Sequence, residues 1–224
     1  MFARMLFPFL CLALPVKACE LALLLAIDVS GSVDRSEYRI QMDGLAAALQ
    51  DGIVSEALVS QQAYVSLLQW TGSSRQRMTL PWTQMRSFED IDAFAQKVSD
   101  DLRIWRNYST AIGEALVTAR EAFEAVPQCR RRVIDVSGDG ISNEGAAPEA
   151  QRKDLTIAGI TVNALAIETD EVDLTAYFFE NVINGEDAFV MTADGFEDYP
   201  PKIKRKLQRE TTKQVSQSSE TAPP

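Results

Sequence analysis

The chain has 224 residues, of which 46% are hydrophobic and 24% are charged, and its formal net charge is −10. This length and composition predict one globular domain with its own core rather than two domains. The chain contains no histidine, which excludes Ser-His-Asp triads, Cys-His pairs and histidine-ligated zinc sites. The excess of acidic residues disfavours binding to nucleic acid and to anionic membranes.

Residues 1–18 have the features of a signal peptide. Arg4 supplies a positive charge, residues 6–16 are mainly apolar, and small residues follow at the expected cleavage point. This apolar run is too short to span a bilayer, and no other stretch approaches the required length. We therefore expect a periplasmic or secreted protein with no transmembrane segment. The alternative is a lipoprotein signal with a lipidated Cys19, although Lys17 fits that motif poorly.

The remaining chain alternates predicted strands and helices. Residues 21–27 form a continuous apolar run, which is typical of a central strand buried on both faces. Asp34 and Glu37 form a capping pair at the start of the first predicted helix, which covers residues 34–50. The later predicted strands cover residues 63–70, 77–82, 133–137, 160–167 and 188–191, and the later helices 88–98, 110–126, 148–158, 173–181 and 198–210.

This order of elements predicts the fold class. Strands that alternate with helices imply βαβ crossovers, and the short turn between strands 63–70 and 77–82 implies one hairpin. We therefore expect an α/β fold: a doubly wound, mostly parallel six-stranded sheet with one antiparallel edge strand and helices on both faces. Residues 19–210 would form this domain. Residues 211–224 are rich in Ser, Thr, Gln and Pro, and are expected to form a disordered tail.

Ligands of such sheets bind at the carboxyl ends of the strands, and the first strand is followed there by three oxygen-bearing side chains. Asp28, Ser30 and Ser32 alternate along the chain, so an extended segment would present them on one side. Gly31 is expected to allow a sharp turn between the two serines.

Two further side chains are expected at the same edge of the sheet. Asp139 follows the strand 133–137, and Thr110 is expected to begin a helix. Together with the first three residues they offer two carboxylates and three hydroxyls. Oxygen-only ligands suit hard cations such as Mg²⁺, Mn²⁺ or Ca²⁺. Because only two ligands carry a charge, the cation would still attract an acidic group from outside.

The pattern Asp28-x-Ser30-x-Ser32, followed by Thr110 and Asp139, resembles the metal-ion-dependent adhesion site (MIDAS) of von Willebrand factor A (VWA) domains and integrin inserted domains. The stretches CELAL, TAIGEAL and RRVIDVSGDG also resemble an exported bacterial subgroup of undefined function. The resemblance implies that the five residues hold the cation, with the aspartates binding directly or through water. Residues 107–109 replace the glycines that the family often has, so we expect a stiffer or differently placed loop.

The resemblance also implies a disulfide bond. In the VWA sheet order the first strand lies beside the strand 133–137, and Cys19 and Cys129 precede these two parallel neighbours. Adjacent strands are about 4.8 Å apart, within the Cα separation that a disulfide bridges. We therefore expect a Cys19–Cys129 bond worth roughly 2–4 kcal/mol. Lipidation of Cys19 would prevent it.

Other polar and aromatic residues have less specific interpretations. Asp135, inside the strand 133–137, is interpreted as a buried, hydrogen-bonded acid rather than a further ligand. Residues 142–144 would either line the binding face or form a solvated loop, and both interpretations stay open. Trp105 is the aromatic candidate for partner recognition. The basic residues 202–206 are expected on a solvated helix face.

These features predict a non-enzymatic, monomeric binding module. A protein partner would supply an Asp or Glu carboxylate to a bound Mg²⁺, or to Mn²⁺ or Ca²⁺. One alternative is a metal-dependent hydrolase or phosphatase, although the Asp28 pattern lacks the second aspartate that aspartyl-phosphate enzymes of this shape use. Another is a structural module whose metal binds no partner. A dinucleotide enzyme is disfavoured because no G-x-G-x-x-G motif follows the first strand.

Overall fold

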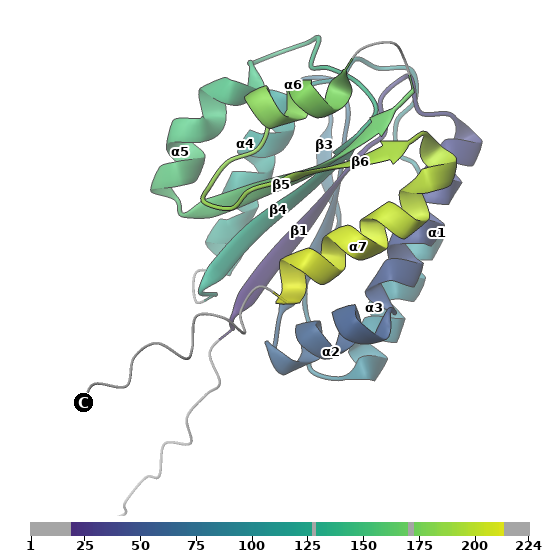
Figure 1. Cartoon of the computed structure of the whole chain (residues 1–224), viewed down its shortest axis with the longest axis vertical. Helices are drawn as coiled ribbons and strands as arrows, with labels where there is room; N and C mark the ends of the chain where they lie inside the picture. Colours follow the sequence, from purple (N-terminus) through teal and green to yellow (C-terminus); the bar gives the residue numbers. More distant parts are fainter. Residues whose placement is uncertain (1–18, 127–128, 170–172, 213–224) are drawn as a thin grey trace, which may run out of the picture.

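The computed structural model describes residues 19–126, 129–169 and 173–212, which fold around a six-stranded sheet (Figure 1). The strand order is β3-β2-β1-β4-β5-β6, in which β3 runs antiparallel to β2 and the other neighbours are parallel. The predicted fold class is therefore confirmed. The strands are β1 (Leu21–Asp28), β2 (Tyr64–Trp70), β3 (Gln76–Gln84), β4 (Arg131–Gly138), β5 (Ile160–Glu168) and β6 (Val190–Asp194).

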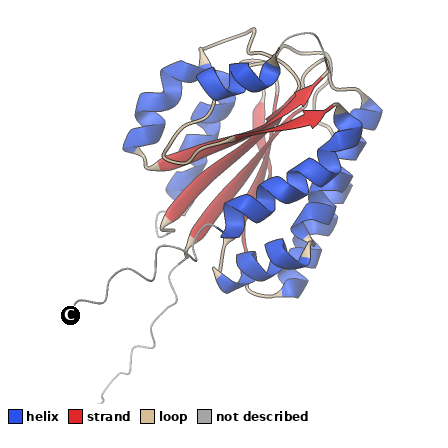
Figure 2. Cartoon of the chain, in the orientation of Figure 1, coloured by secondary structure: helices blue, strands red, loops and turns tan. Residues whose placement is uncertain are grey.

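Helices cover both faces of this sheet (Figure 2). One face carries α1 (Arg35–Leu49), α2 (Gly52–Ser60), α3 (Phe88–Asp100) and α7 (Tyr199–Thr212). The other face carries α4 (Ile112–Ala122), α5 (Arg152–Ile157) and α6 (Leu174–Asn181). Three short 3₁₀ helices complete the described elements: η1 (Phe123–Ala125), η2 (Pro148–Gln151) and η3 (Phe196–Asp198).

The central strand β1 belongs to two hydrophobic cores at once, and every one of its eight residues is buried. Leu21, Leu23 and Leu25 pack in the core beneath α1 and α7, whereas Ala22 and Leu24 pack in the core beneath α4. Side chains alternate between the faces of a sheet, so a strand covered on both sides must be apolar throughout. This requirement explains the continuous apolar run.

Several predicted boundaries differ from the structure. The prediction missed α2, a nine-residue helix that begins where the Asp51 side chain accepts hydrogen bonds from the Ile53 and Val54 amides. α7 continues to Thr212 and so includes the first two residues of the expected tail, because the buried Thr211 hydroxyl donates to Leu207 O. The expected signal peptide and residues 213–224 lie outside the described residues.

The expected Cys19–Cys129 disulfide is present, with a Cα–Cα separation of 4.5 Å. The two cysteines directly precede β1 and β4, which are paired in register from Leu21 opposite Arg131 onward. The bond therefore joins the amino ends of the two strands whose carboxyl ends carry the candidate metal ligands. A lipid thioether on Cys19 is incompatible with this bond.

A buried charged cluster attaches α7 to β4. Lys206 Nζ lies 2.5 Å from Asp135 Oδ1 and donates to Glu210 Oε1 at 2.8 Å, and all three side chains are at most 1% exposed. Asn163 Nδ2 also donates to Glu210 Oε1, at 2.9 Å. The predicted burial of Asp135 is therefore confirmed, but the contact of its carboxylate is the ion pair with Lys206 and not the expected hydrogen bond. The expectation that residues 202–206 are solvated is wrong for Lys206, which turns inward to pair with that acid.

Glu210 gives this cluster a measurable pH dependence. Burial, followed by repulsion from Asp135, raises the pKa of Glu210 from 4.5 to about 8. The folded chain then binds more protons than the unfolded chain between these values, so stability falls as pH rises through that window. We predict that Glu210→Gln reduces this pH-dependent loss of unfolding free energy, by on the order of a few kcal/mol across the window. Urea unfolding at both ends of the window measures it.

The control for this prediction is Glu56→Gln on the exposed side of α2, which should leave the pH dependence of the unfolding free energy unchanged. The quantity compared is the slope of the unfolding free energy against pH. The absolute stability is not compared, because either substitution can shift it by the same amount at every pH. An unchanged slope in Glu210→Gln would show that Glu210 does not hold the buried proton.

Candidate metal centre

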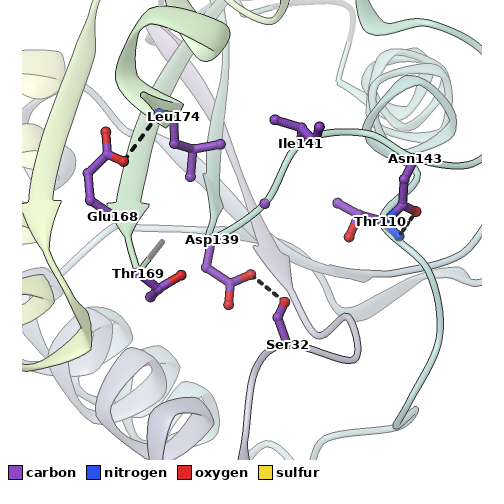
Figure 3. Close-up of a pocket in the computed structure, with 9 residues that line it drawn as sticks. Ser32, Thr110, Asp139, Ile141, Asn143, Glu168, Thr169 and Leu174 are labelled. Atoms are coloured by element: carbon purple, nitrogen blue, oxygen red, sulfur yellow. Dashed lines mark hydrogen bonds between the residues drawn. The ribbon is translucent and has the colours of Figure 1, made fainter. Parts of the chain in front are cut away.

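The five predicted ligands lie at the carboxyl edge of the sheet. Ser32, Thr110 and Asp139 line one cavity of about 230 Å³, and Asp28 and Ser30 are fully buried beside it. Figure 3 shows the Asp139 carboxylate between Ser32 and Thr169, with Thr110 further along the same cavity. The other lining residues are Gly140, Ile141, Asn143, Glu168, Thr169 and Leu174.

Hydrogen bonds already join the first ligand segment to the last. Ser30 N donates to Asp28 Oδ1 at 2.7 Å, and the hydroxyls of Ser30 and Ser32 lie 3.2 Å apart. Ser32 Oγ donates to Asp139 Oδ1 at 2.8 Å across a sequence separation of 107 residues. The first segment therefore reaches the second carboxylate through Ser32, with the Ser30 hydroxyl beside that of Ser32.

Thr110 reaches the cavity in a different way from the one predicted. It was expected to begin a helix, but α4 begins at Ile112 and Ala111 provides no side-chain cap. Instead, Asn143 Oδ1 accepts from Thr110 N at 2.9 Å, and Ser142 Oγ accepts from Ile112 N at 3.2 Å. Ser142 and Asn143 therefore hold the Thr110 segment against the turn that carries Asp139.

Gly31 serves a close approach between two loops rather than a special backbone angle. The turn predicted between the two serines is present, because Val33 N donates to Ser30 O at 3.2 Å. The φ of Gly31 is not positive, so the turn itself does not require a glycine. A Cβ at this position would lie 3.2 Å from Tyr108 O and 3.3 Å from Asn107 Cα, and Gly31 N donates to Tyr108 O at 2.8 Å. Asn107 adopts a φ of 57°, a left-handed conformation that asparagine tolerates. The loop without glycines thus contacts the segment that carries the first three candidate ligands.

Arg103 is a supporting residue that the sequence did not reveal. Its Nη2 donates to the carbonyl oxygens of Val29 and Ser30, at 3.0 and 2.7 Å. These bonds fix the backbone between Asp28 and Ser32 from a segment more than 70 residues away. Trp105, the aromatic residue proposed for recognition, packs half-buried against the core beneath α1, which favours a packing role.

The electrostatics of the cavity favour a cation. Asp28 is fully buried, and its Oδ2 has no hydrogen-bond partner among the described residues. Burial, followed by the negative charge of Asp139, raises the pKa of Asp28 far above its usual range. An added positive charge would offset both effects. The buried oxygen and the all-oxygen donor set therefore fit a hard divalent cation.

The remaining acid of the cavity is engaged elsewhere. Glu168 accepts hydrogen bonds from the amides of Leu174 and Thr175 at 3.2 and 2.8 Å, so it caps the start of α6. In residues 19–126, 129–169 and 173–212, no three His, Cys, Asp or Glu side chains group as a metal site. A cation here would therefore rely on two carboxylates and on neutral hydroxyls.

Solved structures share this architecture. Proximal thread matrix protein 1 from the mussel byssus, described with a zinc-occupied MIDAS motif, is 19% identical, with a TM-score of 0.67 over 85% of this chain and 48% of its own. A von Willebrand factor type A protein from Catenulispora acidiphila is 17% identical, with a TM-score of 0.56 over 87% of this chain and 42% of its own. This chain thus spans about half the length of either protein.

A third similar structure matches almost over its whole length. It is an aerotolerance-related membrane protein from Bacteroides fragilis, 18% identical, with a TM-score of 0.53 over 84% of this chain and 99% of its own. The fold is therefore that of a VWA domain. The chain belongs to the family described as "Protein of unknown function (DUF1194)", whose model matches residues 18–215. No significant match is found among curated proteins.

We predict that Asp139→Asn has opposite effects with and without metal. The asparagine keeps an oxygen for the Ser32 hydroxyl but removes the repulsion on Asp28, so the metal-free chain should become more stable. Mg²⁺ or Mn²⁺ should stabilise the unsubstituted chain by about 2.7 kcal/mol at a hundredfold excess over Kd, and the variant hardly at all. Thermal unfolding in EDTA and in millimolar cation measures both effects.

Asp154→Asn, an equal change of charge at an exposed position of α5, is the matched control. It should respond to the cation as the unsubstituted chain does. Equal stabilisation of the Asp139→Asn variant by the cation would contradict a metal centre at this cavity.

Proposed function

We propose that this chain is an exported, non-enzymatic binding module that recognises a protein partner through a divalent cation. Asp28, Ser30, Ser32, Thr110 and Asp139 would hold Mg²⁺, or Mn²⁺ or Ca²⁺, and a partner's Asp or Glu carboxylate would complete the coordination. When bound, the cation supplies the positive charge that attracts this carboxylate. The chain's own residues position the cation and leave one side of it accessible.

The observation that carries this proposal is that some candidate ligands are buried whereas others face an open cavity. Asp28 and Ser30 have no exposed surface, whereas Ser32 is exposed at the rim of the cavity. A cation held by two carboxylates and three neutral hydroxyls keeps a stronger attraction for an incoming carboxylate than one surrounded by acids. The cavity volume of about 230 Å³ accommodates an acidic side chain.

Two further findings support the cation and the export. The mussel protein with the similar fold carries a zinc-occupied MIDAS motif, which favours divalent metal at the corresponding cavity. The Cys19–Cys129 disulfide fits an oxidising compartment such as the periplasm or the exterior. Among the described residues, no helix has the length and apolar character needed to cross a membrane.

A metal-dependent phosphatase or hydrolase is the competing function. Such an enzyme would activate water with the cation or with a side-chain base, and histidine, the commonest base, is absent from the chain. Glu168, the further carboxylate of the cavity, is already bound by the amides at the start of α6. The side chains around the cavity therefore favour binding over turnover. Hydrolysis of phosphate esters that depends on Mg²⁺ and on Asp139 would favour the enzyme instead.

The proposal is tested with a pair of immobilised peptides that differ only in Glu versus Gln. We expect the mature chain to be retained by the Glu peptide in Mg²⁺ or Mn²⁺, and released by EDTA. The Gln peptide should not retain it, and Asp139→Ala should abolish retention whereas Asp154→Ala should not. Equal retention of the chain by both peptides, or retention that survives both EDTA and Asp139→Ala, would overturn the proposal.

A further inference from the structure

A second cavity beside the metal centre is lined by four arginines. It has a volume of about 430 Å³, and Arg35, Arg39, Arg103 and Arg106 contribute to its walls. Gly31, which lies between the two metal-binding serines, also lines this cavity. The two cavities therefore share one loop. Four guanidinium groups around one cavity are unexpected in a chain with a net charge of −10. We refer to this cavity as the arginine pocket.

Two of these arginines have no acidic partner. Arg35 and Arg106 are exposed, and among the described residues neither side chain forms an ion pair or a hydrogen bond. Arg39 pairs with Asp43 on α1. Arg103 donates to two backbone carbonyls, but its buried Nε has no partner. The guanidinium groups of Arg35 and Arg106 are therefore hydrogen-bond donors without a partner among the described residues.

The acids of the arginine pocket are engaged with other groups. Asp34 Oδ1 accepts from Glu37 N at 2.8 Å, as the cap of α1. Asp101 Oδ2 accepts from the Gln69 amide at 2.9 Å. Neither carboxylate forms an ion pair with Arg35 or Arg106. Hydrogen bonds from amides leave the charge of both acids in place, but four arginines against two aspartates in the lining still give a local excess of positive charge that attracts an outside anion.

We infer that the arginine pocket binds a second carboxylate of the same partner segment that supplies the metal-bound one. This inference rests on the proposed function and specifies the partner: a protein segment with two acidic side chains, one on the cation and one between Arg35 and Arg106. A guanidinium group binds a carboxylate through two parallel hydrogen bonds. Because the chain is acidic, it repels acidic partners in general. A partner segment would bind only if the spacing of its two carboxylates matches the distance between the cation and the arginine pocket.

Exposed apolar side chains line or adjoin both the metal cavity and the arginine pocket. Leu102, 77% exposed, lines the arginine pocket, and Ile141, 42% exposed, lines the metal cavity. Tyr108, 40% exposed, lies in the loop that contacts Gly31. Arginine and aromatic side chains with apolar neighbours are the composition enriched in protein interfaces. The partner segment would thus contact an apolar surface around its two acidic side chains.

The test uses a series of synthetic peptides in which a Gly-Ser scaffold carries one Glu at a fixed position. A second Glu is placed at each successive position along the scaffold, and binding in Mg²⁺ is measured by NMR titration. We expect at least one spacing to bind about tenfold tighter than the single-Glu peptide, the gain typical of a charged hydrogen-bonded pair. The double variant Arg35→Gln, Arg106→Gln should lose this gain and keep the affinity for the single-Glu peptide.

A second double variant, Arg130→Gln with Arg205→Gln, changes the net charge equally at exposed positions outside the pocket and should keep the gain. If no spacing improves binding, or if the pocket variant keeps the gain, the inference fails while metal-dependent binding of the single-Glu peptide still supports the proposed function. If the single-Glu peptide shows no Mg²⁺-dependent binding to the unsubstituted chain, both the proposed function and this inference fail.

Discussion

The apposition of two carboxylates at the ends of neighbouring strands is the constraint on which the rest of this structure depends. Asp28 is the last residue of β1, and Asp139 follows directly on β4. Their strands are paired in parallel from end to end, and a disulfide joins them at the opposite edge. Parallel pairing forces two like charges to the same edge, where burial raises the pKa of Asp28. The cation of the proposed function would compensate both carboxylates.

The same strand β4 also carries the buried anchor of α7, so the candidate ligand and the last helix share one support. Asp135 lies four residues before Asp139 and pairs with Lys206 inside the core. Removing one member of a buried ion pair typically costs about 3–5 kcal/mol, because the other charge is left without compensation. The candidate metal centre therefore lies at the end of a strand whose position is fixed by a disulfide at one end and by an ion pair in its middle.

The fold class could be predicted from the sequence, and so could the presence of Ser32, Thr110 and Asp139 at one cavity, because both depend on short patterns. The apolar run of β1, the capping pair at Asp34 and Glu37, and the polar residues after each strand are local signals, and the structure contains the corresponding elements. The residues that the sequence did not reveal act over long separations. Arg103 bonds carbonyls 73 and 74 residues away, and Asn143 bonds an amide 33 residues away. Such contacts follow from the three-dimensional arrangement of the loops and leave no periodic signal. Lys206 was misplaced for the same reason, since its buried partner belongs to a distant strand.

The most direct test of the metal centre is a crystal soaked in millimolar Mn²⁺ and measured near the manganese absorption edge. An anomalous peak is expected among the oxygens of Asp28, Ser30, Ser32, Thr110 and Asp139, with one coordination position facing the cavity and filled by solvent or by an acidic group. A soaked crystal that diffracts well but shows no anomalous density among these five side chains would contradict the proposed metal centre.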